Sequence, residues 1–139
     1  SYNSSPGPAA ELSSAARQFA GPRRLIAILG DMRELGELAQ VEHERLAALA
    51  LQTCDYIFTI GALTQKYFPG NTKTRKFAEA RKAVPEIKEF IKPGDVILVK
   101  GSQNTIFLEQ IVEALMRDPA DAEHLLCRRG AFWEKKRKV

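Results

Sequence analysis

Three short apolar runs stand out in the pattern of hydrophobic and polar residues along the chain. They lie at Leu25–Leu29, Asp55–Ile60 and Val96–Val99, and each leads into a glycine-containing segment. Continuous apolar runs of this length are typical of strands that are buried on both faces. A fourth and less apolar strand is predicted at Thr74–Phe77.

Between these runs, apolar residues recur at spacings of three and four, which predicts amphipathic helices. The predicted helices cover residues 9–20, 37–53, 62–68, 78–91 and 105–117. Pro85 lies inside the 78–91 helix and should kink it or begin its second half, because a proline ring displaces a helical hydrogen bond. The buried side of the 37–53 helix is expected to use Leu38, Val41, Leu46, Leu49 and Ala50.

Strands that alternate with helices of this length form parallel βαβ units. The sequence therefore predicts a three-layer α/β domain of the Rossmann-like type, with a mainly parallel sheet. The 139 residues, of which 45% are hydrophobic and 27% charged, fit one globular domain.

The net charge of +4 is concentrated at the end of the chain. Residues 128–139 hold six basic residues against one acidic residue, so the remainder is close to neutral. We expect 118–139 to be a helical or disordered basic tail on a nearly neutral domain. Nucleic-acid binding through this tail is one alternative function, and we favour it less because no basic face is predicted on the domain itself.

The sequence does not support a metal-binding, disulfide-rich or membrane-spanning protein. Cys54 and Cys127 are too far apart in sequence for a metal-ligand motif or a dense disulfide framework. No apolar run approaches the roughly 20 residues that span a bilayer. We expect reduced thiols, no metal site, no membrane contact and a cytoplasmic location.

Candidate chemistry is concentrated in the two loops that follow the first and last predicted strands. In residues 30–36, Asp31, Arg33 and Glu34 place charges of both signs at the carboxyl end of a strand, where α/β proteins bind ligands. This mixture suits a zwitterionic ligand. Lys100, Gly101 and Ser102 stand ahead of a predicted helix whose free amides favour an anion. We expect the two loops to form one composite cleft.

These residues also have purely structural interpretations. Asp31 and Glu34 are equally suited to cap the following helix, as Ser102 or Asn104 is to cap the next. His43 lies one turn into a predicted helix without a second ligand, so we expect a surface or packing residue and not a catalyst.

The usual catalytic motifs are missing. The chain has no Gly-x-x-x-x-Gly-Lys-Ser/Thr phosphate loop, no Gly-x-Gly-x-x-Gly dinucleotide motif and no serine nucleophile elbow. No residue is therefore assigned a catalytic role, and the chain is expected to hold only part of an active site.

Three blocks of the chain resemble a known family. They are residues 1–6 (SYNSSP), residues 28–36 (ILGDMRELG) with His43 after them, and residues 94–102 (GDVILVKGS). Together they resemble the C-terminal domain of the Mur ligases, and most of all the branch that adds D-alanyl-D-alanine to a UDP-muramoyl-tripeptide. The resemblance covers about residues 1–117.

The resemblance implies an ATP-dependent, ADP-forming amide ligase of bacterial peptidoglycan synthesis, and thus a part in cell-wall biogenesis, cell shape and cell division. In the family, ATP and Mg²⁺ are bound mainly by a central domain, and the UDP-sugar by an N-terminal domain. Neither is expected in these 139 residues. The chain is therefore interpreted as a fragment that is inactive alone and works with those two domains.

The resemblance also implies roles for individual residues. Asp31, Met32 and Arg33 would face the incoming amine, D-alanyl-D-alanine or a related compound. Tyr2 and Asn3 would lie near the nucleotide. The remaining acceptor-facing residues would be Lys100, Gly101, Ser102 and Gln103.

One departure leaves the identity of the acceptor open. The family usually has arginine after Lys-Gly-Ser, where this chain has the neutral Gln103. A stand-alone module that binds a nucleotide or small ligand is a further alternative, because it would show the same fold.

Overall fold

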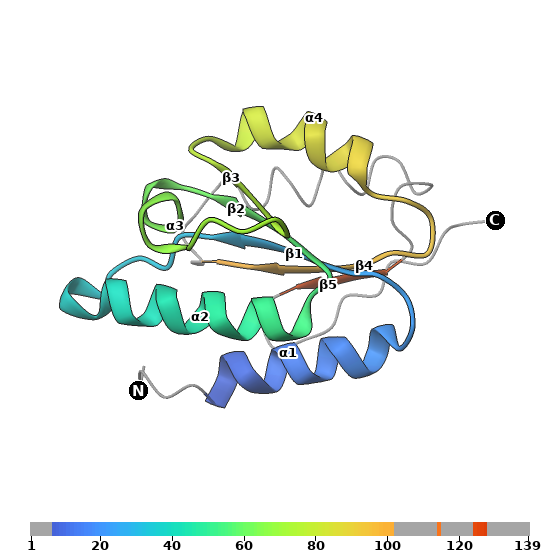
Figure 1. The fold of residues 1–139 in the computed structure, drawn as a ribbon, viewed down its shortest axis with the longest axis horizontal. Helices are drawn as coiled ribbons and strands as arrows, with labels where there is room; N and C mark the ends of the chain where they lie inside the picture. Colours follow the sequence, from blue (N-terminus) through green and yellow to red (C-terminus); the bar gives the residue numbers. More distant parts are fainter. Residues whose placement is uncertain (1–6, 102–113, 115–123, 128–139) are drawn as a thin grey trace.

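A computed structural model describes residues 7–101, 114 and 124–127 (Figure 1). Five parallel strands form one sheet in the order β3-β2-β1-β4-β5. The predicted parallel α/β architecture is confirmed. The strands are β1 (Leu25–Gly30), β2 (Tyr56–Ile60), β3 (Thr74–Phe77), β4 (Val96–Lys100) and β5 (His124–Cys127).

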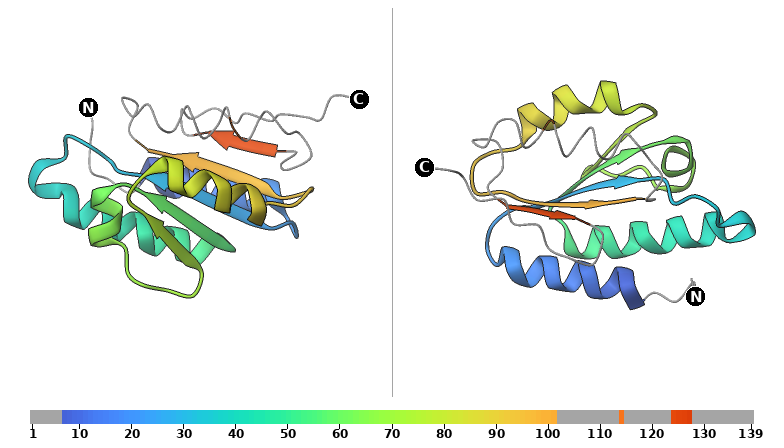
Figure 2. Two further views of the ribbon diagram at one scale, coloured as in Figure 1. Left: turned by 90° about the horizontal axis from the view of Figure 1, so that it is seen from above. Right: turned by 180° about the vertical axis from the view of Figure 1, so that it is seen from behind.

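Helices cover both faces of the sheet, which gives the three predicted layers. Helices α1 and α2 lie on one face and α4 on the other, as Figures 1 and 2 show. No helix among the described residues is long and apolar enough to cross a membrane. The helical elements are α1 (Gly7–Ala20), the 3-10 turn η1 (Gly36–Leu38), α2 (Ala39–Thr53), α3 (Ala62–Tyr67) and α4 (Ala80–Phe90).

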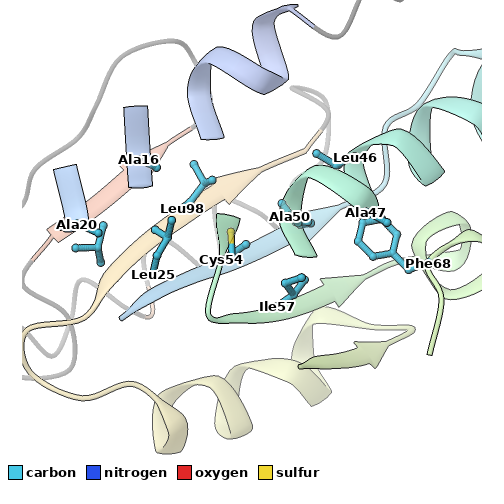
Figure 3. Packing of buried hydrophobic residues seen from close by; sticks show 13 residues of the cluster. Ala16, Ala20, Leu25, Leu46, Ala47, Ala50, Cys54, Ile57, Phe68 and Leu98 are labelled. Carbon is cyan, nitrogen blue, oxygen red and sulfur yellow. The ribbon is translucent and has the colours of Figure 1, made fainter. Parts of the chain in front are cut away.

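Two hydrophobic cores lie between the sheet and the helices, one on each face of the sheet. Beneath α1 and α2, Ala16 and Ala50 face the sheet residues Leu25 and Leu98, and all four are buried (Figure 3). Alanines at these positions let the helices approach the strands closely. The second core, on the α4 face, is built from Ile26, Ile28, Phe58, Ile60, Phe77, Ala83, Ile87, Ile91, Ile97 and Val99.

The start of the second long helix differs from the prediction. Leu46 and Ala50 are buried as expected, but Leu38 and Val41 are each 43% exposed. The reason is position, because η1 and the first turn of α2 extend past the carboxyl ends of the strands (Figure 1). Helical spacing identified the apolar residues but not where the sheet beneath them ends.

Helix α4 spans Pro85 as a single element, so the helix does not begin anew there. Pro85 is exposed, while Ile87 and Ile91 are buried. The backbone N–H that proline lacks is therefore missing on the solvent side of the helix.

The end of the chain also differs from the prediction. His124–Cys127 forms β5, which pairs with β4, although 118–139 was expected to be helical or disordered. A strand whose only aliphatic residues are Leu125 and Leu126 leaves little local pattern. The boundary at 117 stays a prediction. Of the predicted 105–117 helix, Ala114 is helical and the other residues lie outside the described part.

Candidate functional site

The two candidate loops begin side by side at the same edge of the sheet. Strands β1 and β4 are parallel neighbours, and Leu29 pairs with Lys100 at their carboxyl ends. From β1 the chain passes to β2 and β3 on one side, and to β4 and β5 on the other. The strand order therefore reverses between β1 and β4, which is where open α/β sheets bind ligands.

Asp31, the first residue after β1, binds the backbone of α3. Its Oδ1 accepts a hydrogen bond from Thr64 N at 2.8 Å, and its Oδ2 accepts one from Leu63 N at 3.0 Å. A carboxylate at this position satisfies amides that the first turn of a helix leaves without partners. The structural interpretation of Asp31 is thus confirmed in kind, but the helix that it caps is α3 and not the one that follows it.

Gly61 makes this contact possible. It lies between β2 and α3 with φ +128°, a conformation that side-chain-bearing residues rarely adopt. A Cβ added to Gly61 would collide with the carboxylate of Asp31. From the sequence pattern, Gly61 is predicted only to end the Asp55–Ile60 strand. Its position at the carboxyl edge, where it could meet the loop after β1, was the available indication.

His43 connects α2 to the same loop. The side chain is fully buried, and its Nδ1 lies 2.6 Å from Ala39 O. Its Nε2 accepts a hydrogen bond from Met32 N at 3.0 Å. Because an amide N–H can only donate, Nε2 carries no proton, and Nδ1 is the donor to Ala39 O. The expected packing role is confirmed, whereas the contact with Met32 was missed.

Beyond Asp31 the loop turns toward solvent. Met32 is half-buried and packs against the core under α1 and α2, while Arg33 and Glu34 are exposed. Glu34 has φ +64°, the only left-handed residue other than glycine among those described. Such a conformation costs of order 1–3 kcal/mol and persists where its surroundings fix it.

Part of the predicted site lies outside the described residues. Lys100 is half-buried at the end of β4, and Gly101 after it is buried. Ser102 and Gln103 are not described, nor are Tyr2 and Asn3. The composite cleft and the roles of these residues stay predictions.

Ion pairs and burial elsewhere in the domain shift the pKa values of several groups. At the amino end of β1, Arg24 donates to both carboxylate oxygens of the buried Asp95, at 3.0 and 2.6 Å, which raises the pKa of Arg24. Burial raises the pKa of the Cys54 thiol. These groups join β1 to its neighbours or lie in the core, and none reaches the candidate site.

Nothing in the described part of the chain resembles a metal centre. No group of three or more His, Cys, Asp or Glu side chains there could hold an ion. The carboxylates at the candidate site are instead occupied by backbone amides, as Asp31 is, or exposed, as Glu34 is.

Comparison with known families shows to which family this chain belongs. The family described as Mur ligase, glutamate ligase domain, matches residues 1–103. This chain belongs to the Mur ligase family. The match includes both candidate loops and confirms the resemblance on which the acceptor-site prediction rests.

Two curated relatives of this Mur ligase domain are UDP-N-acetylmuramoyl-tripeptide–D-alanyl-D-alanine ligases. The Bacillus subtilis (strain 168) protein is 30% identical over 125 residues, which cover 85% of this chain and 27% of the relative. The Mycobacterium tuberculosis (strain CDC 1551 / Oshkosh) protein is 30% identical over 124 residues, which cover 74% of this chain and 24% of the relative. The chain thus spans about a quarter of their length.

A solved structure shares the fold of the Mur ligase domain. It is the MurF ligase of Thermotoga maritima, crystallised in complex with ADP. The match has a TM-score of 0.57 with 19% identity, and covers 76% of this chain and 26% of that one. At this identity the likeness supports the fold alone.

Proposed function

We propose that this Mur ligase domain binds the incoming amine in an ATP-dependent, ADP-forming ligase that adds D-alanyl-D-alanine to a UDP-muramoyl-tripeptide in peptidoglycan synthesis. The observation that carries the proposal is the pairing of Leu29 with Lys100, which brings the two loops to one edge at the strand-order reversal. Both curated relatives described above carry this activity in their names.

The charges at this edge fit a dipeptide with a free ammonium and a free carboxylate. Arg33 and Glu34 supply both signs on the loop after β1, and Lys100 supplies a cation at the end of β4. The two loops proposed to form the acceptor site contain Asp31, Met32, Arg33, Lys100, Gly101, Ser102 and Gln103. Tyr2 and Asn3 would lie near the nucleotide.

Binding of ATP and Mg²⁺ is proposed to lie mainly outside these residues. The sequence has no phosphate loop, and the described residues contain no cluster of three or more His, Cys, Asp or Glu side chains that could hold a metal ion. We therefore assign both to a central domain of the complete enzyme, with the UDP-sugar on an N-terminal domain. These 139 residues alone should not hydrolyse ATP.

The contribution of the domain would be positioning. The acceptor amine attacks the activated carboxyl carbon of the tripeptide, an amide bond forms, the activating group leaves and the nitrogen loses a proton. Holding the two reactants in reacting geometry contributes up to about 7–11 kcal/mol in intramolecular systems. No residue of this domain needs to act as a chemical catalyst for that effect.

A chimera tests the proposal. Residues 1–139 replace the matching segment of the Bacillus subtilis ligase, and mass spectrometry follows ligation of D-alanyl-D-alanine to UDP-muramoyl-tripeptide. We expect ATP-dependent product from the chimera and no ATP turnover by residues 1–139 alone. A chimera that folds, as judged by its thermal melt, but makes no product would contradict the proposal.

Calorimetry with the isolated chain distinguishes the stand-alone module. Under our proposal, residues 1–139 bind ATP, a UDP-sugar and D-alanyl-D-alanine weakly or not at all. A micromolar affinity for any of them would favour an independent binding module.

A further inference from the structure

We propose that His43 and Asp31 are positioning residues, which fix the loop after β1 in the conformation that presents Arg33 to the acceptor. This inference rests on the proposed function and refines it. Asp31 then acts through the backbone of α3, and is not the carboxylate that meets the acceptor's ammonium group.

The loop is held from two independent helices. His43 on α2 accepts from Met32 N at 3.0 Å, and the amides of Leu63 and Thr64 on α3 bind Asp31 at 3.0 and 2.8 Å. Two consecutive loop residues are thereby fixed by elements that pack on the sheet. Arg33 follows them directly, so its backbone position is set before the chain turns into solvent.

The contact of His43 is specific to a neutral imidazole. Both ring nitrogens are used, one as donor to Ala39 O and one as acceptor from Met32 N. The ring is fully buried, so water does not replace a lost partner. A side chain that packs equally well without an acceptor atom would leave the Met32 amide unsatisfied.

The contact of Asp31 leaves a different carboxylate for the ligand. Each oxygen of Asp31 already accepts one backbone amide, and the carboxylate lies against Gly61. Glu34 is exposed three residues later in the same loop. We expect a ligand ammonium group at Glu34, which is the more exposed of the two carboxylates.

Three variants in the chimera separate positioning from stability. His43→Leu removes the acceptor, whereas His43→Gln keeps an amide oxygen at similar reach for Met32 N. Leu46→Ala is the matched control, since Leu46 is buried on the same helix but belongs to the core. KM and kcat are measured for D-alanyl-D-alanine and for ATP, beside the melting temperature.

We expect His43→Leu to raise KM for the dipeptide by about three- to tenfold, the equivalent of one buried hydrogen bond, with KM for ATP unchanged. His43→Gln should recover most of this loss. Leu46→Ala should lower the melting temperature and leave both KM values unchanged. Equal effects of His43→Leu and Leu46→Ala on KM would overturn the inference.

A spectroscopic measurement on residues 1–139 tests the contact without any assay. Imidazole ¹⁵N shifts should report the Nδ1–H form of His43, and the Met32 amide should exchange slowly with solvent. If His43→Leu is too unstable for kinetics, this measurement on the unaltered chain still decides. A protonated Nε2 or a rapidly exchanging Met32 amide would overturn the inference, whereas an inactive unaltered chimera would instead contradict the proposed function.

Discussion

The carboxylate of Asp31 occupies the space that a side chain on Gly61 would need. The two residues are 30 positions apart in sequence and follow neighbouring strands, β1 and β2. Their contact, together with the bonds from Leu63 N and Thr64 N, fixes the first residue of the candidate acceptor loop. A glycine far from that loop in sequence is therefore part of its support.

Substitution of Gly61 by alanine should destabilise the domain by about 2–4 kcal/mol. The cost combines a backbone conformation that is unfavourable for alanine with displacement of the Asp31 cap. Denaturant unfolding measures the change. Gly70→Ala is the control, because an added Cβ there meets nothing within 4 Å. A Gly61→Ala loss no larger than that of Gly70→Ala would show that the contact is unimportant.

Breaking the pair of Arg24 and Asp95 should also destabilise the fold. Asp95 is only 4% exposed and accepts from Arg24 and from Lys92 N, so Asp95→Asn should cost about 2–3 kcal/mol. Chemical denaturation provides the measurement. Glu79→Gln breaks the exposed pair with Arg81 and should cost far less, because solvent screens the charges of an exposed pair. Similar losses for both variants would contradict this assignment.

The decrease in the free energy of unfolding at acid pH should depend on Asp55. Desolvation raises the pKa of its carboxyl group, but the bonds from Leu25 N and Arg17 outweigh this and leave the pKa lowered. A lowered folded-state pKa means that the carboxylate stabilises the fold above the unfolded value of about 3.9 and ceases to do so as pH falls through the folded value.

The test compares the unfolding free energy of the wild type and Asp55→Asn as pH decreases from neutral. The variant should be less stable at neutral pH, and the difference should shrink below about pH 4. Because the Asp55 side chain is 48% exposed, solvent screening keeps the effect modest. A difference that stays constant across this range would argue against a role for the charge.

The exposed apolar residues of η1 and of the first turn of α2 should contribute little to stability. Leu38→Ala and Val41→Ala should each cost less than about 0.5 kcal/mol, because both side chains are 43% exposed. Leu46→Ala, at a position that is 4% exposed, should cost about 2–4 kcal/mol. Urea unfolding distinguishes the three, and a large loss at Val41 would mean that it is buried in solution.

The sequence predicted the elements of the fold better than the contacts between them. Strands β1, β2 and β4 are continuous apolar runs because helices cover both faces, and such runs are visible locally. Strand β5 was missed because its only aliphatic residues are Leu125 and Leu126, too short an apolar run to indicate a strand. Leu38 and Val41 were misplaced because helical spacing does not reveal where the sheet ends.

The sequence predicted which two loops form the candidate site, but not the contacts that hold the first of them. The order of strands and helices implied that residues after β1 and β4 lie at one edge, and the pairing of Leu29 with Lys100 agrees. The use of Asp31 and His43 to hold the first loop was not predictable, because it depends on amides of α3 and Met32 that only folding brings near.

The most direct test of acceptor binding is the pair of KM values for D-alanyl-D-alanine and ATP in chimeras that carry Arg33→Gln or Lys100→Gln. We predict that each substitution raises KM for the dipeptide at least about tenfold, because a charged hydrogen bond contributes about 1.5–3 kcal/mol, and leaves KM for ATP unchanged. A rise in KM for ATP with an unaltered KM for the dipeptide would contradict the proposal.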